Sequence, residues 1–168
     1  MSSTPTPTPA LPALYLCPLN NSFAPKCIPL AGGTRVPLGR ACGAPHTAPT
    51  RANGRFPGGV LSRAHAEVWA QDGAVFVRDV QSQNGTYVNG ARLAAERATS
   101  PPAVLRTGDE LVLGFDIFDA DGVRKLHHRV AARVVCAFTA DEARAAELAA
   151  FVPGALGGEG GAGVMAAL

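Results

Sequence analysis

Four short polar segments along the chain carry residues that could bind an anion. They are Gly39-Arg40, Ser62-Arg63-Ala64-His65, the segment from Asp79 through Ser82-Gln83-Asn84-Gly85-Thr86, and Val88-Asn89-Gly90. The guanidinium of Arg40 is a planar fork of donors that suits phosphate oxygens, Ser62 adds a hydroxyl donor, and Arg63 adds a second cation. Gln83 and Asn84 carry amide donors, and Asn84 can also accept, which suits it to the main chain of a peptide. Each segment alone is common, but together they predict a site that binds an anion and a peptide.

The same segments lack the groups that catalysis would need. His65 lies three residues from Ser62, and in a strand that spacing directs the two side chains to opposite faces. The sequence has no phosphate-binding glycine loop of the Walker type and no carboxylate pair placed for acid–base chemistry. Donors without a paired nucleophile and base recognise a ligand but do not react with it. We therefore expect a binding protein rather than an enzyme, with no catalytic residue.

Composition excludes several other classes. The 168 residues suit one domain with tails. The net charge is only +2, with basic and acidic residues intermingled, so we expect no nucleic-acid partner. The apolar-leaning segment 1–24 is interrupted by prolines and predicts neither a membrane span nor a signal peptide. The cysteines have no Cys-x-x-Cys spacing, so we expect reduced thiols, no metal or other cofactor, and a cytoplasmic or nuclear location; they are Cys17, Cys27, Cys42 and Cys136.

The elements that must position the polar segments are short strands. Between residues 13 and 138, short apolar runs alternate with turn residues, which predicts an all-β fold of nine to eleven short strands, an antiparallel sandwich or barrel. Asp72-Gly73 and Asn89-Gly90 are typical of tight hairpin turns. The stretch 41–59 is rich in Gly, Pro and Ala, and we expect it to be a long flexible loop.

The two ends of the chain differ from this β-rich region. Residues 1–12 are rich in Ser, Thr and Pro and predict a disordered arm. A capping box at residues 139–142 predicts a short helix over 139–152. The Gly-rich segment 153–168 should stop that helix and form a disordered tail.

In their order and combination, the four polar segments resemble the signature of the forkhead-associated (FHA) domain over about residues 13–138. The resemblance implies an eleven-stranded β-sandwich whose loops bind phosphothreonine peptides. By position, it implies that Arg40 and Ser62 hold the phosphate and that Arg63 supports the peptide backbone or an acidic neighbour. It places Asn84 on the main chain just after the phosphothreonine. Gln83 replaces the Ser, Thr or Lys more usual in the family, and it stays among the candidate phosphopeptide-binding residues.

The remaining residues of the signature resemble the structural support of an FHA site. His65 and Thr86 are similar to the internal braces of the family, and Asn89-Gly90 is similar to its hairpin turn. Gly39 and Gly85 complete this supporting set.

A narrower resemblance implies a cellular role. The stretch Leu61–Trp69, with Arg78-Asp79-Val80 and the long loop before it, is similar to FHA domains of the sarcolemmal-membrane-associated protein and fungal factor-arrest family. Those proteins are subunits of striatin-interacting phosphatase and kinase (STRIPAK) complexes. The resemblance implies a signalling adaptor for phosphothreonine-containing proteins, with STRIPAK subunits or kinases as candidate partners. It also implies recruitment to endomembranes through partners or through a tail that this chain lacks.

A second interpretation has the same fold but does not require a phosphate for binding. In it, the domain is a scaffold that binds partners through the faces of the sandwich without phosphate dependence. The presence of Arg40, Ser62 and Asn84 together favours the phosphothreonine interpretation.

Overall fold

A computed structural model describes residues 7–151 of the chain. The predicted N-terminal arm, 1–12, lies partly outside the described residues, and the predicted tail, 153–168, lies entirely outside them.

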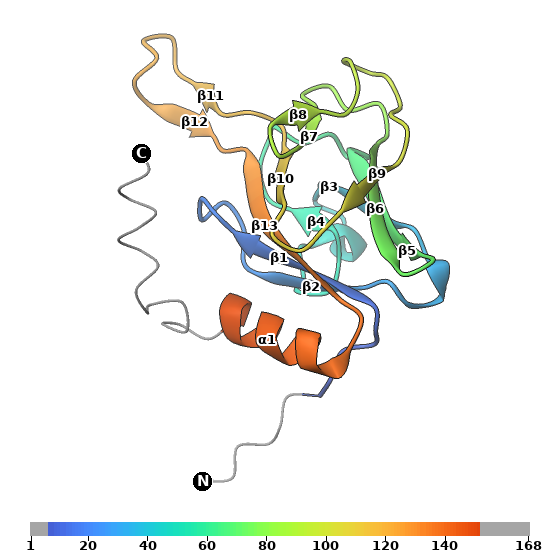
Figure 1. Cartoon of the computed structure of the whole chain (residues 1–168). Coiled ribbons are helices and arrows are strands. Elements are labelled where there is room, and N and C mark those ends of the chain that lie inside the picture. Colours follow the sequence, from blue (N-terminus) through green and yellow to red (C-terminus); the bar gives the residue numbers. More distant parts are fainter. Residues whose placement is uncertain (1–6, 152–168) are drawn as a thin grey trace, which may run out of the picture.

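Two β-sheets face each other in the described part of the chain (Figure 1). The six-stranded sheet has the order β2-β1-β13-β10-β7-β8, and the five-stranded sheet has the order β4-β3-β5-β6-β9. A separate two-stranded hairpin, β11-β12, projects from the sandwich. The strands are β1 (Ala13–Pro18), β2 (Lys26–Pro29), β3 (Val36–Arg40), β4 (Arg55–Phe56), β5 (Ala66–Gln71), β6 (Ala74–Asp79), β7 (Thr86–Val88), β8 (Ala91–Arg92), β9 (Ala103–Leu105), β10 (Glu110–Leu113), β11 (Ile117–Phe118), β12 (Lys125–His127) and β13 (Val130–Ala137).

The core lies between the sheets because apolar residues alternate along the strands. In β13, Val130, Ala132 and Val134 face inward and belong to the main buried cluster. In β5 and β6, Val68 and Val77 contribute to the same cluster from the opposite sheet. The expected all-β sandwich is thus confirmed, and the eleven strands of its two sheets match the expected number.

Residues with positive φ close the hairpins that the sequence predicts. Asp72 (φ 51°) and Gly73 (φ 75°) join β5 to β6, and Asn89 (φ 50°) and Gly90 (φ 83°) join β7 to β8. Two successive positive φ values are the backbone of a type I′ turn, whose twist matches that of paired strands. Asx-Gly pairs favour this conformation, so these turns follow directly from local sequence.

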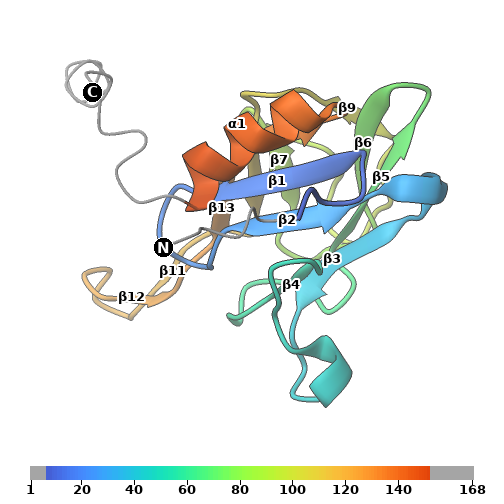
Figure 2. The same ribbon diagram turned by 90° about the horizontal axis from the view of Figure 1, so that it is seen from below.

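The C-terminal helix α1 (Ala140–Phe151) packs on the outer face of β1 and β13 (Figure 2). Its capping box forms as expected: the Thr139 hydroxyl accepts a hydrogen bond from the Glu142 N–H (3.2 Å), and the Glu142 carboxylate accepts one from the Thr139 N–H (3.2 Å). Ala143 and Ala146 are buried in a second small cluster beside Tyr15. Among residues 7–151, no helix is long and apolar enough to cross a membrane.

The stretch 41–59 has more structure than its composition suggests. It contains a 3-10 helix (Pro45–Thr47) and β4, which pairs with β3 in parallel. Within residues 7–151 this is the one pairing that departs from the expected antiparallel pattern. The buried Lys26 ammonium donates to the carbonyl of Thr50, and the Cys27 N–H donates to the carbonyl of Arg51 (2.8 Å). These hydrogen bonds come from β2, which is distant from the loop in sequence. Local composition therefore could not predict them. The flexibility expected for this loop stays a prediction.

Replacing Lys26 by Met tests how far this side chain fastens the loop. We expect hydrogen exchange in residues 47–54 to become several-fold faster, because Met fills the space but cannot donate to the carbonyl of Thr50. Exchange measured by mass spectrometry would report the change, with Lys125→Met in the exposed β12 strand as the control. Unaltered exchange in Lys26→Met would show that the loop is held by other contacts.

Candidate functional site

The end of β3 meets the loop before β5 at close range. The Arg40 N–H donates to the carbonyl of Ser62 (3.0 Å), and the His65 N–H donates to the carbonyl of Leu38 (3.0 Å). At Gly39, a Cβ atom would lie 1.9 Å from the carbonyl oxygen of Arg63. Only glycine permits this approach, which places Arg40 beside Ser62.

His65 joins two of the polar segments from inside the protein. The imidazole is fully buried; its Nδ1 accepts a hydrogen bond from the Ser62 N–H (3.1 Å), and its Nε2 lies 2.8 Å from the carbonyl oxygen of Gly85. Since Nδ1 accepts, the neutral ring carries its proton on Nε2 and donates to Gly85. Burial lowers the pKa of His65, outweighing the opposing effects of the Gly85 hydrogen bond and the Asp79 charge.

The geometry at His65 corrects the spacing argument made from the sequence. Strand β5 begins only at Ala66, so residues 62–65 form a turn rather than an extended strand. The turn lets the His65 ring reach back to the backbone of Ser62. The contact is with the backbone N–H of Ser62, and the Ser62 hydroxyl is engaged elsewhere, with Gln83.

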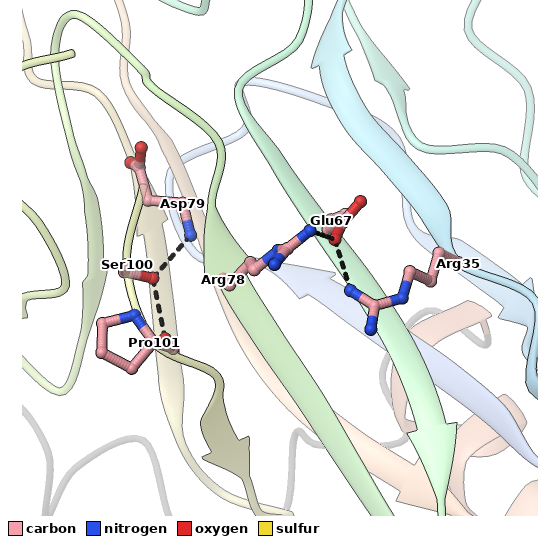
Figure 3. A network of polar contacts seen from close by, with 6 residues as sticks. All are labelled: Arg35, Glu67, Arg78, Asp79, Ser100 and Pro101. Carbon is pink, nitrogen blue, oxygen red and sulfur yellow. Dashed lines mark hydrogen bonds and ion pairs between the residues drawn. The ribbon is translucent and has the colours of Figure 1, made fainter. Parts of the chain in front are cut away.

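A buried carboxylate shapes the second segment. Asp79, at the end of β6, accepts hydrogen bonds from the Ser82 N–H (2.8 Å), the Ser82 hydroxyl and the Thr86 hydroxyl (2.7 Å). The Ser82 oxygen in turn accepts from the Gly85 N–H (3.0 Å). On the other side, the Asp79 N–H donates to the Ser100 hydroxyl (2.9 Å; Figure 3). These bonds fix the turn that carries Gln83 and Asn84.

Asp79 and Ser82 stand in one of the polar segments noted in the sequence, but neither was assigned a role at the site, and Ser100 was not noted at all. The signal that could have found Asp79 and Ser82 is their spacing: a carboxylate at a strand end, followed three and seven residues later by hydroxyls. No local pattern predicts the role of Ser100, because its hydroxyl accepts a hydrogen bond from Asp79 across two separate segments of the chain.

Direct hydrogen bonds connect the two segments at the surface. The Gln83 N–H donates to the Ser62 hydroxyl oxygen (3.3 Å), and the Asn84 side-chain amide donates to the carbonyl of Val60 (2.9 Å). The structure therefore brings Arg40, Ser62, Gln83 and Asn84 into one loop cluster. Asn84 uses one donor within the protein, and within residues 7–151 its side-chain oxygen has no hydrogen-bond partner.

The loop cluster carries positive charge that its neighbours do not neutralise. Within the described residues, neither the Arg40 nor the Arg63 guanidinium has a hydrogen-bond or ion-pair partner. The Arg55 guanidinium joins them, because it donates to the carbonyl of Arg63 (3.0 Å). The nearby carboxylate of Glu67 is paired with Arg35 (2.7 Å) and Arg78 (2.6 Å), as Figure 3 shows.

Cys42 marks the edge of this positive region and was not expected at the site. Its thiol is exposed, and its pKa is lowered by hydrogen bonds with Thr47 and the backbone of Ala44, helped by the positive charges of Arg63 and Arg55. Burial instead raises the pKa of the other three thiols, Cys17, Cys27 and Cys136.

Asn89 and Gly90 lie away from the loop cluster. They form the turn at the end of β7 opposite to Asn84 and Gly85, where Asn89 contacts Asp109 (3.0 Å) and the Glu110 N–H (2.9 Å). The structure thus does not bring this pair to the site, because a three-residue strand separates them from it. Their contribution is to close the β7–β8 hairpin.

The donors of the cluster lie on adjoining loops. Guanidinium groups, a hydroxyl and a carboxamide are groups of the kind that bind an anion and a peptide main chain. Within residues 7–151, no group of three or more His, Cys, Asp or Glu side chains could hold a metal ion.

Comparisons with known proteins agree with this geometry. The family model described as the FHA domain matches residues 36–114. An uncharacterized protein of Schizosaccharomyces pombe is 40% identical over 123 residues, which cover 72% of this chain and 40% of the relative. The human sarcolemmal membrane-associated protein is 37% identical over 82 residues, which cover 48% of this chain and 10% of the relative. The matched regions therefore cover less than half of the length of either protein.

Solved structures include similar chains at lower identity. One, from a study of phosphothreonine-dependent FHA domain interactions, has a TM-score of 0.46 and 20% identity over 73% of this chain and 94% of that chain. Another, an FHA domain from Arabidopsis thaliana, has a TM-score of 0.47 and 19% identity over 79% of this chain and 92% of that chain.

Replacing His65 by Ala should destabilise the fold by about 1–3 kcal/mol, because the Ser62 N–H and the Gly85 carbonyl lose their buried partner. The effect should depend on pH. A folded pKa below the unfolded value of about 6.5 means that the contribution is complete above that pH and is lost as the pH falls toward the folded value. Denaturant unfolding from pH 7 to pH 5 should therefore show a steeper loss for the wild type than for His65→Ala. His46→Ala, at an exposed position, is the control, and parallel slopes for the wild type and His65→Ala would contradict this role.

Cys42 should react first among the four cysteines with iodoacetamide, because it is exposed and its pKa is lowered while the others are raised. Peptide mass spectrometry after brief alkylation near pH 7 would identify the modified thiol. Arg63→Gln should slow the reaction by removing one of the charges that favour the thiolate. Faster labelling of Cys17 than of Cys42 would refute the assignment.

Proposed function

Because residues 36–114 of the chain form an FHA domain, we propose that the loop cluster of Arg40, Ser62, Arg63, Gln83 and Asn84 binds phosphothreonine peptides. FHA domains are generally phosphothreonine-binding signalling modules. The observation that carries the proposal is the Arg40 guanidinium, which has no partner within the described residues and is held beside Ser62 by a backbone hydrogen bond.

The proposed roles follow from the donors available. Arg40 forms charge-assisted hydrogen bonds with the phosphate oxygens, and Ser62 donates its hydroxyl proton to one of them. The hydroxyl proton is available because Ser62 uses only its oxygen, as an acceptor from Gln83. Arg63 adds positive charge on the exposed side of the loop, where it can contact the peptide backbone or an acidic side chain.

Asn84 is proposed to hold the peptide main chain. Its side-chain oxygen can accept a backbone N–H of the peptide, while its amide remains bonded to the carbonyl of Val60. That internal bond fixes the rotamer, so the free oxygen is oriented before the peptide arrives. The Gln83 side chain is exposed next to Ser62, and we place it at the margin of the phosphate site.

At the cellular level we propose a signalling adaptor in a STRIPAK-type assembly, with phosphothreonine-containing STRIPAK subunits or kinases as partners. The support is the stretch Leu61–Trp69 and the 37% identity to the human sarcolemmal membrane-associated protein. Such an adaptor works in the cytoplasm or nucleus, with partners recruiting it to endomembranes. Co-purification of tagged protein with STRIPAK subunits, lost in Arg40→Ala, is the test of this assignment.

Replacing Arg40 by Ala should weaken binding of a phosphothreonine peptide by about 1.5–3 kcal/mol, roughly 10- to 150-fold in Kd. Arg40→Lys should restore only part of the loss, because an ammonium cannot reproduce the bidentate fork. Ser62→Ala should cost less than Arg40→Ala, since it removes one neutral donor. Calorimetric titration would measure the Kd values.

Controls separate loss of the site from loss of the fold. Arg144→Ala, at an exposed position on α1, should leave binding unchanged. Melting midpoints of all variants should stay close to that of the wild type, because Arg40 and Ser62 are half-buried and Arg144 is exposed, so none belongs to the hydrophobic core. An Arg40→Ala protein that is folded and keeps its affinity, or equal binding of the unphosphorylated peptide, would contradict the proposal and favour a phosphate-independent scaffold.

A further inference from the structure

A serine or threonine stands directly before a proline at four places in the chain. These pairs are Thr4-Pro5, Thr6-Pro7, Thr8-Pro9 and Ser100-Pro101. Ser100 is only 4% exposed, and its hydroxyl accepts a hydrogen bond from the backbone of Asp79. Thr4 and Thr6 lie outside the described residues, whereas Thr8 is described and exposed. Within residues 7–151, Thr8 is thus the one hydroxyl before a proline that lies at the surface.

The backbone around Thr8 suits the substrate groove of a kinase. A residue that precedes proline is restricted to extended conformations, and residues 7–10 belong to no helix, strand or turn. Protein kinases bind the acceptor residue in an extended segment, and proline-directed kinases require proline at the next position. Thr8-Pro9 meets both requirements.

The N-terminal segment 7–12 is anchored beside α1 (Figure 1). Leu11 packs against the second buried cluster, to which Ala143 and Ala146 of α1 belong. Three residues span at most about 11 Å when fully extended, so Thr8 stays close to the helix. Thr8 lines a pocket of about 450 Å³ together with one stripe of α1, whose members recur at intervals of three or four. They are Ala140, Ala143, Arg144, Glu147, Leu148 and Phe151.

Arg51 contributes a fixed guanidinium group to this pocket. It is paired with Glu147, and its guanidinium carbon lies 3.6 Å from the centre of the Phe151 ring. The Glu147 carboxylate also accepts a hydrogen bond from the Tyr15 hydroxyl (3.2 Å). The one carboxylate among the described lining residues is therefore already partnered, which reduces its repulsion of an added anion.

Arg144 contributes a second guanidinium group, and this one is weakly engaged. Its distance to the Asp141 carboxylate is 3.7 Å, and the two side chains are 75% and 92% exposed. Exposed ion pairs of this kind contribute little to stability, so the Arg144 guanidinium can turn to a stronger acceptor. A phosphate is such an acceptor, because it carries nearly two negative charges and three oxygens.

We propose that Thr8 is a phosphorylation site for a proline-directed kinase and that its phosphate is held in the pocket by Arg144 and Arg51. In the modification, the Thr8 hydroxyl oxygen forms a bond to the γ-phosphorus of ATP. The bond from that phosphorus to the bridging oxygen breaks to leave ADP, and the hydroxyl proton passes to the kinase. The bound phosphate fixes segment 7–12 along α1. None of these residues belongs to the loop cluster, and the inference is independent of the proposed function.

The test uses the full chain with Thr4→Ala and Thr6→Ala, so that Thr8 is the remaining Thr-Pro acceptor. Incubation with ATP and a proline-directed kinase should add one phosphate to Thr8, identified by peptide mass spectrometry and absent in Thr8→Ala. In a ³¹P NMR titration, the second pKa of this phosphate should lie about 0.5 pH units below its ordinary value of about 6, because the guanidinium groups favour the dianion.

Variants of the pocket separate docking from phosphorylation. Arg144→Ala, and separately Arg51→Gln, should return the pKa of the phosphate toward 6. Arg124→Ala, at an exposed position between β11 and β12, is the matched control and should leave the pKa low. Phosphorylation should also slow hydrogen exchange in α1 several-fold, and Arg144→Ala should remove this slowing.

Each outcome has a distinct meaning. If the kinase modifies a Thr-Pro control peptide but adds no phosphate to Thr8, the site is wrong. A phosphate with the same pKa in the wild type, Arg144→Ala and Arg51→Gln would overturn its docking on α1. Dimers of the phosphorylated chain that are lost in Arg40→Ala would also overturn the docking, in favour of binding to the loop cluster of a second copy. Melting curves identify any unfolded variant, and Arg144→Gln then replaces Arg144→Ala.

Discussion

The neutral, buried imidazole of His65 is the contact on which the site depends. It accepts from the backbone of Ser62 and donates to the backbone of Gly85, so one side chain sets the separation of two loops that are distant in sequence. The arrangement works only with the proton on Nε2, because a protonated Nδ1 would oppose the Ser62 N–H. Burial favours this neutral form, so the fold itself maintains the tautomer that the loops require.

Around this contact, the acidic side chains are paired inside the protein, and the arginines at the surface are not. Asp79 uses its carboxylate on Ser82 and Thr86 inside the turn, and Glu67 is paired with Arg35 and Arg78 on the sheet. Neither carboxylate is left to neutralise the arginines at the surface. The rigid interior therefore presents Arg40 and Arg63 without internal partners, which is the preorganisation that anion binding requires.

Local sequence predicted those parts of the structure that local physics determines. The Asx-Gly turns and the capping box of α1 require no distant contacts, and the sequence predicted both correctly. Strands β4 and β12, of two and three residues, are too short for a periodic pattern and are defined by their partners. The candidate binding residues came from a motif, but the motif could not reveal that Asn84 is tied to Val60 or that Asn89 turns away from the site. Those contacts depend on which loops the sandwich brings together.

The most direct test of this account is an amide chemical-shift titration of the ¹⁵N-labelled chain with a phosphothreonine peptide. The account predicts that the largest shifts fall on residues 40–41, 60–64 and 82–85, and that the unphosphorylated peptide leaves these signals in place. The backbone amides of Ser62 and Gln83 should respond most, because both lie where the phosphate is proposed to bind. Shifts confined to α1 or to the outer faces of the sheets, or equal shifts with both peptides, would contradict it.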